Sequence, residues 1–260
     1  MLPSPADTTS ARRRDALRLR PAAERFQSRN SWLDSRHSFS FAEHDDPLWR
    51  GFGPLRVINE DWIAAGQGFG PHPHRDMEII TVLLAGALSH RDSLGHSAVI
   101  RAGEVQCMSA GTGIVHSEIN AGAQTCRLLQ IWIEPRTAGL PPTYRQRAFP
   151  DREGWTALID PGGRGEALSI ERPVQLWRGR ARGASRLPLP PLDAPLGWIQ
   201  LIEGGVDLEH DGDGDGDGDG GGDGSGLSLA AGDGLGFRAG SVRSLSSSAA
   251  GADLLLFALN

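Results

Sequence analysis

Cysteine is scarce in this sequence of 260 residues, and long hydrophobic runs are absent. The two cysteines, Cys107 and Cys126, form no CxxC pair, a pattern that fits a reducing compartment, where thiols behave as small apolar side chains. We therefore expect no disulfide between them. No apolar run approaches the ~20 residues that span a bilayer, and the N-terminal stretch MLPSPADTTSARRRDALRLR lacks the apolar segment of a secretory signal. The sequence predicts a cytoplasmic protein with no membrane partner.

An excess of negative charge is also missing once one segment is set aside. The formal net charge is −6, and six aspartates of the tract DGDGDGDGDGGGDGSG account for all of it (Asp211, Asp213, Asp215, Asp217, Asp219 and Asp223). The rest of the chain is balanced, so nothing indicates a nucleic acid as partner. Calcium-binding β-roll repeats also use Gly and Asp, but they need a periodic apolar residue, which the tract lacks. We expect a solvated, disordered loop over residues 211–226.

Helical periodicity is weak throughout, and the composition favours strands. The chain is 39% hydrophobic, enough for a core, while 35 glycines and 17 prolines favour tight turns. From Leu55 onward, short apolar runs alternate with turn residues about every 8 to 12 positions, which predicts an all-β barrel or sandwich. The expected strands lie in LRVINEDWIAAGQGFG, MEIITVLLAG, ALSHRDSLG, SAVIRAGEVQCMSAGTG, CRLLQIWIEP, EALSIERPVQLWRGRA, GWIQLIEGGVDLE, LSLAAGDGLGF and ADLLLFALN.

One segment, EPRTAGLPPTYRQRAFPDREG, is rich in proline and polar residues and interrupts this β pattern. It favours a boundary between two β-domains of similar size joined head to tail, which we place at residues 1–145 and 146–260. Because two stacked β-domains can cover their own sheet edges, we expect a monomer.

The segment GFGPHPHRDME holds two histidines, His72 and His74, in a stretch with little reason to be helical. In a strand, residues i and i+2 point to the same face about 6–7 Å apart, which suits two ligands of one transition metal ion. Taken alone, however, the pair favours two surface histidines in a proline-stiffened loop over a metal site. The pattern therefore needs a partner elsewhere in the chain.

A second pair with the same spacing follows in SAGTGIVHSEIN, where His116 and Glu118 again stand two residues apart. If the two short strands face each other across a barrel, three imidazoles and one carboxylate converge, a set that binds a divalent transition metal and can leave coordination positions open. Gly111 and Gly113 suit a turn with positive φ just before His116. The remaining histidines stand singly in polar or turn-like sequence and are not expected to join the cluster: His37, His44, His90, His96 and His210.

These motifs resemble the pirin family of bicupins, most closely the bacterial quercetinase-type members. The resemblance is carried almost continuously from Trp32 to Pro135, by WLDSRHSFSFAEHDDP, GFGPLRVINEDWIAAGQGFGPHPHRDMEIITVLLAG, HRDSLG, MSAGTGIVHSEIN and LQIWIEP. The second half matches more loosely, through WIQLIEG, GDGLGF and LLLFALN, and the Asp-Gly tract departs from the pattern as an insertion. The resemblance implies two double-stranded β-helix (jelly-roll) barrels joined head to tail.

The resemblance also implies a metal held by His72, His74, His116 and Glu118 in the first barrel. Iron is the expected metal, with manganese, nickel, copper and zinc as alternatives. In many other cupins the acidic ligand follows the HxH pair by a few residues, where Glu78 stands here. We assign the ligand role to Glu118 and expect Glu78 to support the site from outside or to serve the fold. The second barrel has no HxH pair, so we expect it to be free of metal.

The function implied is that of a quercetin 2,3-dioxygenase, which opens a flavonol with O2 and releases carbon monoxide. Glu118 is the expected catalytic base for the flavonol hydroxyl. Phe39, Phe41 and Trp132 either hold the flat substrate near the barrel mouth or belong to the core. Eukaryotic pirins are described as iron-dependent co-regulators, so a metal or redox sensor acting through a protein partner is the alternative. A third possibility is a metal site that has lost its chemistry.

Overall fold

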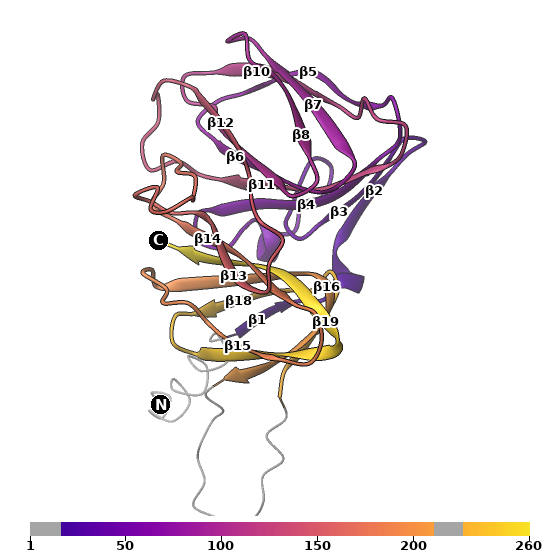
Figure 1. The fold of residues 1–260 in the computed structure, drawn as a ribbon. Coiled ribbons are helices and arrows are strands. Elements are labelled where there is room, and N and C mark those ends of the chain that lie inside the picture. Colours follow the sequence, from indigo (N-terminus) through magenta and orange to yellow (C-terminus); the bar gives the residue numbers. More distant parts are fainter. Residues whose placement is uncertain (1–16, 211–225) are drawn as a thin grey trace, which may run out of the picture. The chain divides into compact units, whose positions relative to one another are not determined.

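The computed structural model describes residues 17–210 and 226–260, and within these ranges it is built of strands and two short 3₁₀ turns, without an α-helix (Figure 1). The all-β prediction is therefore confirmed. The 3₁₀ turns are Ala22–Glu24 and Pro47–Trp49. The strands are β1 (Leu17–Arg20), β2 (Phe26–Arg29), β3 (Leu33–His37), β4 (Leu55–Ile63), β5 (Gly68–His74), β6 (Glu78–Ala85), β7 (Ala87–Asp92), β8 (Ser97–Arg101), β9 (Glu104–Ser109), β10 (Ile114–Ile119), β11 (Cys126–Ile133), β12 (Thr143–Ala148), β13 (Gly154–Ile159), β14 (Gln175–Ala181), β15 (Arg186–Pro188), β16 (Leu196–His210), β17 (Ser228–Ala230), β18 (Gly234–Arg238) and β19 (Val242–Leu259).

The chain divides into two compact units. One, which we call the N-terminal barrel, comprises Ala23–Arg152, Thr156–Leu176 and Leu259–Asn260. The other, the C-terminal unit, comprises the described part of Met1–Ala22 together with Glu153–Trp155 and Trp177–Ala258. The units are therefore not continuous in sequence, since β1 pairs antiparallel with β18 inside the C-terminal unit.

Two antiparallel sheets build the N-terminal barrel. A seven-stranded sheet runs in the order β12-β9-β6-β11-β4-β3-β2, and a four-stranded sheet runs β5-β10-β7-β8. Figure 1 shows them curving around a common interior. One end of that interior is an apolar cluster to which both sheets contribute: Ile63, Leu83, Leu88, Ile100, Cys126 and Leu128. Burial of these side chains, each worth about 1.5–3 kcal/mol, holds the sheets face to face.

A row of polar side chains crosses the inner face of the seven-stranded sheet. His37, Asn59, Gln130, Thr81 and Gln106 stand opposite one another in register on five adjacent strands. Side chains of a strand alternate between faces, so the residues two positions away on these strands share the inner face. The barrel interior therefore carries hydrogen-bonding groups next to its apolar cluster, a composition suited to a site rather than to a plain core.

The C-terminal unit contains most of an eight-stranded sheet, ordered β1-β18-β16-β19-β14-β13 with β15 added to β19 and β17 to β16. Glycine is needed where an aromatic ring lies against the neighbouring strand. A Cβ at Gly179 would approach the ring of Trp155 to 2.6 Å, so no larger residue fits there without a shift. Within the described residues, no group of metal-ligating side chains occurs in this unit.

Several segments differ from the sequence-based expectation. Three strands, β1, β2 and β3, precede Leu55, where the β pattern was expected to begin. They were not predicted because their sequences LRLR, FQSR and LDSRH alternate charged with partly buried residues and contain no apolar run. β12 lies within the segment interpreted as a boundary, and it pairs with β9. A loop was predicted over residues 211–226. Residues 211–225 lie outside the described residues, and Gly226 is the one residue of this prediction that is described. Among the residues described, no helix has the length and apolar character to cross a membrane.

Candidate metal centre

The two histidine-containing pairs lie on neighbouring strands of the four-stranded sheet. His72 and His74 end β5, while His116 and Glu118 lie on β10, which pairs antiparallel with β5 so that His116 stands directly opposite His72. The strands are thus adjacent, and do not face each other across the barrel as expected. The ring centroids of His72 and His116 are 4.4 Å apart, and those of His74 and His116 are 4.8 Å apart. One nitrogen of each of the three rings lies within 4.8 Å of the others, which is the spacing of a shared metal ion.

A β-bulge in β5 sets the orientation of His72. His116 pairs with His72, but Glu118 pairs with Phe69, so β5 carries one extra residue between these pairs. Pro71 lies in that interval and has no N–H to offer the ladder, which accounts for the interruption. The displaced carbonyl of Gly70 accepts a hydrogen bond of 2.8 Å from His72 Nδ1. The Nε2 atom of His72 is then the nitrogen left to bind a metal, in the manner usual for metal-binding histidines.

The imidazoles of His74 and His116 are neutral at physiological pH. Burial, reinforced by the neighbouring His72, lowers the pKa of His74 to about 4. Burial, followed by the influence of His72 and His74, lowers the pKa of His116 to about 3. Nε2 of His116 is buried and has no hydrogen-bond partner among the residues described. A buried, unpartnered lone pair is costly unless a ligand takes it, so the donor set fits a divalent metal ion.

Glu118 lies inside the barrel and is 2% exposed. Its carboxyl accepts a hydrogen bond from Gln130 Nε2 at 2.8 Å, and Thr81 Oγ1 lies 3.4 Å from its other oxygen. Burial first, and then the nearby charge of Asp61, raise the pKa of Glu118 to about 7. An oxygen of Glu118 also lies within 4.8 Å of the ligand nitrogens of His116 and His90. The structure therefore brings Glu118 next to His116, at a pKa where the carboxyl can take up or release a proton near neutral pH.

Glu78 is directed elsewhere. Its side chain alternates with that of Ile79 and so lies on the opposite face of β6 from the inward-facing Thr81. The buried carboxyl accepts hydrogen bonds from Ser109 Oγ at 2.5 Å and from the Glu171 backbone N–H at 3.2 Å. This placement supports the choice of Glu118 over Glu78 as the acidic group of the site.

Aromatic side chains line the approach to the histidines. The ring of Trp132 meets His74 edge to face at a centroid distance of 4.9 Å, and Phe41 packs against Trp132 at 5.4 Å. Phe39 is 1% exposed and lies near Trp49 at 6.5 Å, so it belongs to the core. Of the three aromatic residues expected near the barrel mouth, Phe41 and Trp132 therefore lie next to the histidines.

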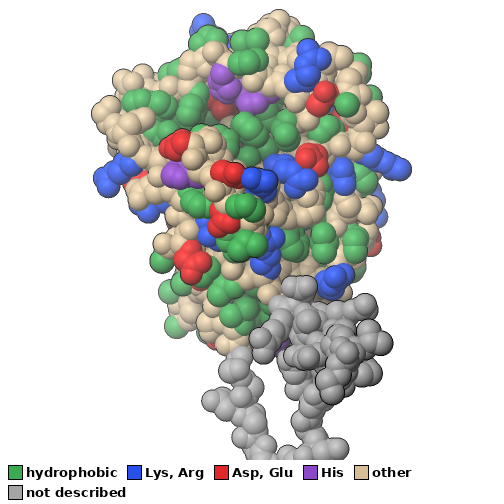
Figure 2. Space-filling model, turned by 180° about the vertical axis from the view of Figure 1, so that it is seen from behind, with side chains coloured by type: hydrophobic (Ala, Val, Ile, Leu, Met, Phe, Trp, Pro, Cys, Tyr) green, Lys and Arg blue, Asp and Glu red, His purple; other side chains and the backbone are tan. Residues whose placement is uncertain are grey.

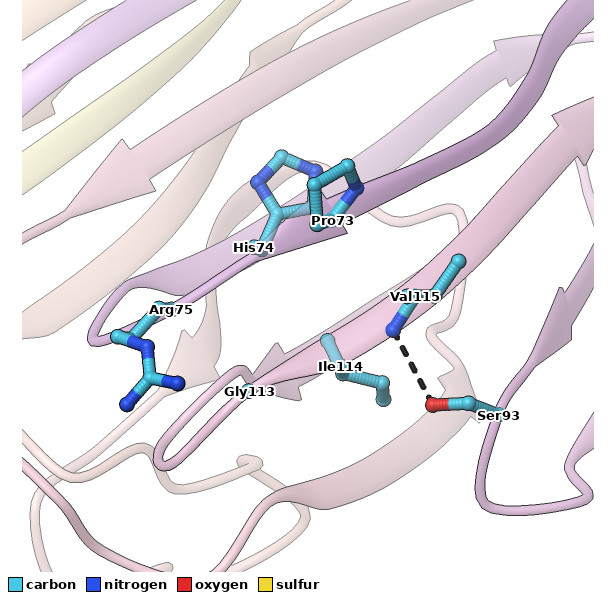
Figure 3. Close-up of a pocket in the computed structure, with 7 residues that line it drawn as sticks. All are labelled: Pro73, His74, Arg75, Ser93, Gly113, Ile114 and Val115. Atoms are coloured by element: carbon cyan, nitrogen blue, oxygen red, sulfur yellow. Dashed lines mark hydrogen bonds between the residues drawn. The ribbon is translucent and has the colours of Figure 1, made fainter.

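The centre lies close to the molecular surface. His72 and His74 are partly exposed, and in Figure 2 histidine side chains surface among hydrophobic ones. An open pocket of about 410 Å³ adjoins His74 and is lined by Pro73, His74, Arg75, Ser93, Gly113, Ile114 and Val115. Figure 3 shows Pro73 and His74 on β5, Ile114 and Val115 on β10, and Ser93 on the segment after β7, with the Val115 backbone N–H donating to Ser93 Oγ at 3.1 Å. The cluster therefore borders solvent through the partly exposed His72 and His74.

Comparisons with known proteins identify the family of this chain. The model of the family described as pirin matches residues 19–133. The chain is 44% identical over 191 residues to the quercetin 2,3-dioxygenase of Escherichia coli K12, covering 73% of this chain and 83% of that relative. This chain belongs to the pirin family. The crystal structure of YhhW from Escherichia coli is similar at 38% identity with a TM-score of 0.84, covering 94% of this pirin and 97% of that chain. A structure of bacterial pirin YhhW in complex with nickel(II) matches with a TM-score of 0.82 and 38% identity, covering 94% and 98%. The bicupin prediction is confirmed by these matches.

Some residues around the centre of this pirin were not anticipated. Gln130 and Thr81 lie against Glu118, and each is a polar residue with two apolar residues on either side, in LLQIW and IITVL, which is a signal that could have been used. His90 was expected to stand apart, yet it is fully buried and its Nδ1 lies 3.5 Å from Nδ1 of His116. His37 was also expected to stand apart, and it is a buried side chain hydrogen-bonded to Asn59 and Ser28. The turn before His116 is as expected, with φ of 47° at Gly111 and 138° at Gly113.

Proposed function

We propose that this pirin is a dioxygenase that opens a flavonol ring with O2, using one divalent transition metal ion held by His72, His74, His116 and Glu118. The proposal depends on the cluster of His72, His74 and His116, with the buried carboxyl of Glu118 next to His116. The name of the Escherichia coli relative, quercetin 2,3-dioxygenase, supports the reaction class, and the nickel(II) complex of YhhW supports a metal at such a site.

The donor set indicates which metals suit the site. Three neutral imidazoles and one carboxylate bind iron, manganese, nickel, copper or zinc, and they leave positions open for further ligands. Hard oxygen-only ions such as Ca²⁺ or Mg²⁺ are disfavoured by the nitrogen donors. We propose iron as the native metal, and elemental analysis of protein purified without added metal tests this choice.

The reaction begins with removal of a proton from the substrate. A bound divalent metal supplies positive charge that lowers the pKa of a hydroxyl beside it. Glu118 takes the proton of the flavonol 3-hydroxyl, which leaves an electron-rich flavonolate and a neutral carboxyl. Gln130 holds the carboxyl in place through its 2.8 Å hydrogen bond. The flavonolate then consumes one O2 and releases one carbon monoxide as the ring opens.

Residues near the histidines suit a flat aromatic substrate. Trp132 and Phe41 offer ring faces and edges next to His74, and stacking or edge-to-face contacts with an aromatic ligand are each worth about 0.5–1.5 kcal/mol. Nε1 of Trp132 is buried and has no hydrogen-bond partner in the part of the chain that the structure describes. That N–H is available to a hydroxyl or carbonyl oxygen of the substrate, which would favour polyphenols over plain hydrocarbons.

The test is turnover of quercetin followed by loss of flavonol absorbance, O2 consumption and carbon monoxide release. We expect activity in the metal-loaded protein, loss by at least 100-fold in His72→Ala and Glu118→Gln, and loss on treatment with a chelator. Glu78→Gln is the matched control, because Glu78 is a buried acid of the same domain on the opposite face of its strand. It should retain activity.

Two results would contradict the proposal. Absence of O2 consumption by fully metal-loaded protein, with several flavonols, would remove the enzymatic function. If metal loading then changed the binding of a protein partner, the sensor function would take its place. Equal loss of activity in Glu78→Gln and Glu118→Gln, with both variants folded, would remove Glu118 from its assigned role.

A further inference from the structure

A buried histidine outside the proposed ligand set lies directly behind one of its members. His90 is on β7, which pairs with β10 so that His90 stands opposite Glu118 and Asp92 stands opposite His116. Its side chain is 0% exposed. Nδ1 of His90 lies 3.5 Å from Nδ1 of His116, a long hydrogen bond, and Nε2 of His90 lies 3.1 Å from Oδ2 of Asp92. The three side chains therefore form a line from the candidate metal centre outward.

One arrangement of protons satisfies this line. Nδ1 of His116 meets His90, whereas Nε2 is buried and has no hydrogen-bond partner among the residues described, so Nε2 is the nitrogen left to bind the metal and carries no proton. The proton of neutral His116 is then on Nδ1, which donates to Nδ1 of His90. Since His90 accepts at Nδ1, its own proton is on Nε2, which donates to Asp92. Every N–H meets an acceptor, as buried polar groups require.

Asp92 is the outermost residue of this line, and further hydrogen bonds fix its carboxylate. Its side chain is 0% exposed, and Oδ1 accepts hydrogen bonds from the backbone N–H groups of Leu94 at 2.9 Å and His96 at 3.0 Å. His96 also approaches Oδ2 with its Nδ1 at 2.9 Å, and its side chain is 42% exposed. The ring of Tyr144 packs on both His90, at 4.8 Å, and His96, at 5.1 Å. These contacts hold the His90 ring in a single orientation.

We propose that His90, backed by Asp92, is a positioning residue of the metal centre: it holds His116 in the Nδ1–H tautomer and directs Nε2 of His116 toward the ion. The inference depends on the proposed metal-binding function and deepens it. A carboxylate or carbonyl behind a metal-binding histidine fixes its tautomer and ring angle, and loss of such a partner typically weakens metal binding about 10- to 100-fold. Here the carboxylate of Asp92 acts on His116 through the imidazole of His90. His90 itself is not assigned as a ligand, because both of its nitrogens are already engaged.

The first experiment compares Ni²⁺ binding by competition with a chelator. His90→Phe keeps a ring of similar size but offers no acceptor to His116, and we expect its Kd to rise about 10- to 100-fold. His90→Gln retains an acceptor oxygen and should recover part of that loss. His210→Phe is the matched control, since His210 ends β16 in the C-terminal unit, outside the line of contacts from Asp92 to His116, and its Kd should stay within about threefold of wild type. Thermal melting of each metal-free variant shows whether it is folded.

The second experiment observes the tautomers directly and does not need a variant. In wild-type protein loaded with Zn²⁺, ¹⁵N chemical shifts should show the proton of His116 on Nδ1 and that of His90 on Nε2. A third experiment returns to the variant: cobalt-loaded His90→Phe should keep the absorption intensity of wild type, because the number of ligands is unchanged.

Several outcomes would overturn the inference. These are a wild-type Kd in folded His90→Phe, a proton on Nδ1 of His90, or a cobalt spectrum showing one ligand fewer in His90→Phe. Failure of the proposed function has a different signature: wild-type protein would then bind no metal, or would bind it and show no turnover while the effect of His90 on Kd persisted.

Discussion

Gln130 donates a hydrogen bond of 2.8 Å from Nε2 to Oε2 of the buried Glu118 carboxyl. The orientation of the amide is fixed from its other side, because Oε1 accepts from Thr81 Oγ1 at 2.9 Å. A donor of this kind stabilises the charged form of a carboxyl and opposes the rise of its pKa through burial. The pair therefore adjusts how readily Glu118 exchanges a proton.

Replacing Gln130 by leucine removes this donor, so the pKa of Glu118 should rise further. Because the ionised carboxyl is the form that accepts the substrate proton, the acidic limb of the pH–kcat/KM profile should shift to higher pH, with kcat/KM lowered about tenfold at pH 7. Thr81→Val is the comparison, since Thr81 approaches Glu118 only to 3.4 Å and should shift the limb less. An unshifted profile in Gln130→Leu would show that the amide does not act on Glu118.

The close approach of β5 to β10 depends on Gly68. A Cβ at this position would overlap the carbonyl oxygen of Glu118 and lie 2.7 Å from Cα of Ile119. Gly68→Ala should therefore force the strands apart, cost about 1–3 kcal/mol of stability, and weaken Ni²⁺ binding. Gly70→Ala, on the same strand with nothing within 4 Å of the added Cβ, should leave both unchanged. Denaturant unfolding and metal titration of the two variants decide the matter, and equal behaviour would refute the argument.

Asp61 should make the protein less stable as the pH rises through neutrality. Burial, and then the charge of Glu60, raise its pKa to about 7, so the folded state binds a proton between roughly pH 4 and 7 that the unfolded state has released. This group favours folding most at low pH, and its contribution falls as pH rises through 7. Asp61→Asn keeps an acceptor for Ser35 and should gain roughly 2 kcal/mol relative to wild type between pH 5 and 8.

The measurement is the unfolding free energy of metal-free wild type and Asp61→Asn at several pH values. Comparing the two proteins cancels the opposite contribution of the buried histidines, whose lowered pKa values make the folded state less stable as pH falls below about 6.5. A difference between the two proteins that is flat from pH 5 to 8 would mean that Asp61 ionises normally.

Metal binding should also stabilise the fold. A ligand that binds only the native state at 100 times its Kd adds about 2.7 kcal/mol to the unfolding free energy. Addition of Ni²⁺ should therefore raise the melting temperature of wild type, and a chelator should reverse the rise. His72→Ala, which lacks one imidazole of the cluster, should respond weakly. A similar rise in both proteins would place the binding site elsewhere.

The pairing of His72 with His74, and of His116 with Glu118, could be predicted because it follows from strand parity, whereas the joint set of four ligands came from the resemblance to pirins. His72 with His74, and His116 with Glu118, stand two residues apart, which places each pair on one face of its strand whatever the fold. The same reasoning gave the strands with continuous apolar runs. It could not give the register between strands, and so the direct opposition of His72 and His116 was not foreseen.

Register also explains what was missed. Thr81 and Gln130 come from strands other than that of Glu118, and only the pairing of β6 with β11 brings them to the same point on the inner face. His90 was set aside because it is the only histidine in ALSHRD. Its position two residues after the buried Leu88 nevertheless places it on the same, inward-facing side of the strand. The short strands β2 and β3 were missed because β2 is stabilised by pairing with β3, and β3 by pairing with β4, and not by apolar sequence of their own.

The bulge at Gly70 and Pro71 constrains how this family can change in length. Between His72 and the following Pro73 and His74 the strand is regular, so inserting or deleting one residue there would turn one imidazole away from its partner. The same event on the Phe69 side would only enlarge or abolish the bulge and leave both imidazoles facing His116. Natural variation in chain length should therefore collect before Pro71 and spare the three residues that end β5, whatever substrate the enzyme has come to use.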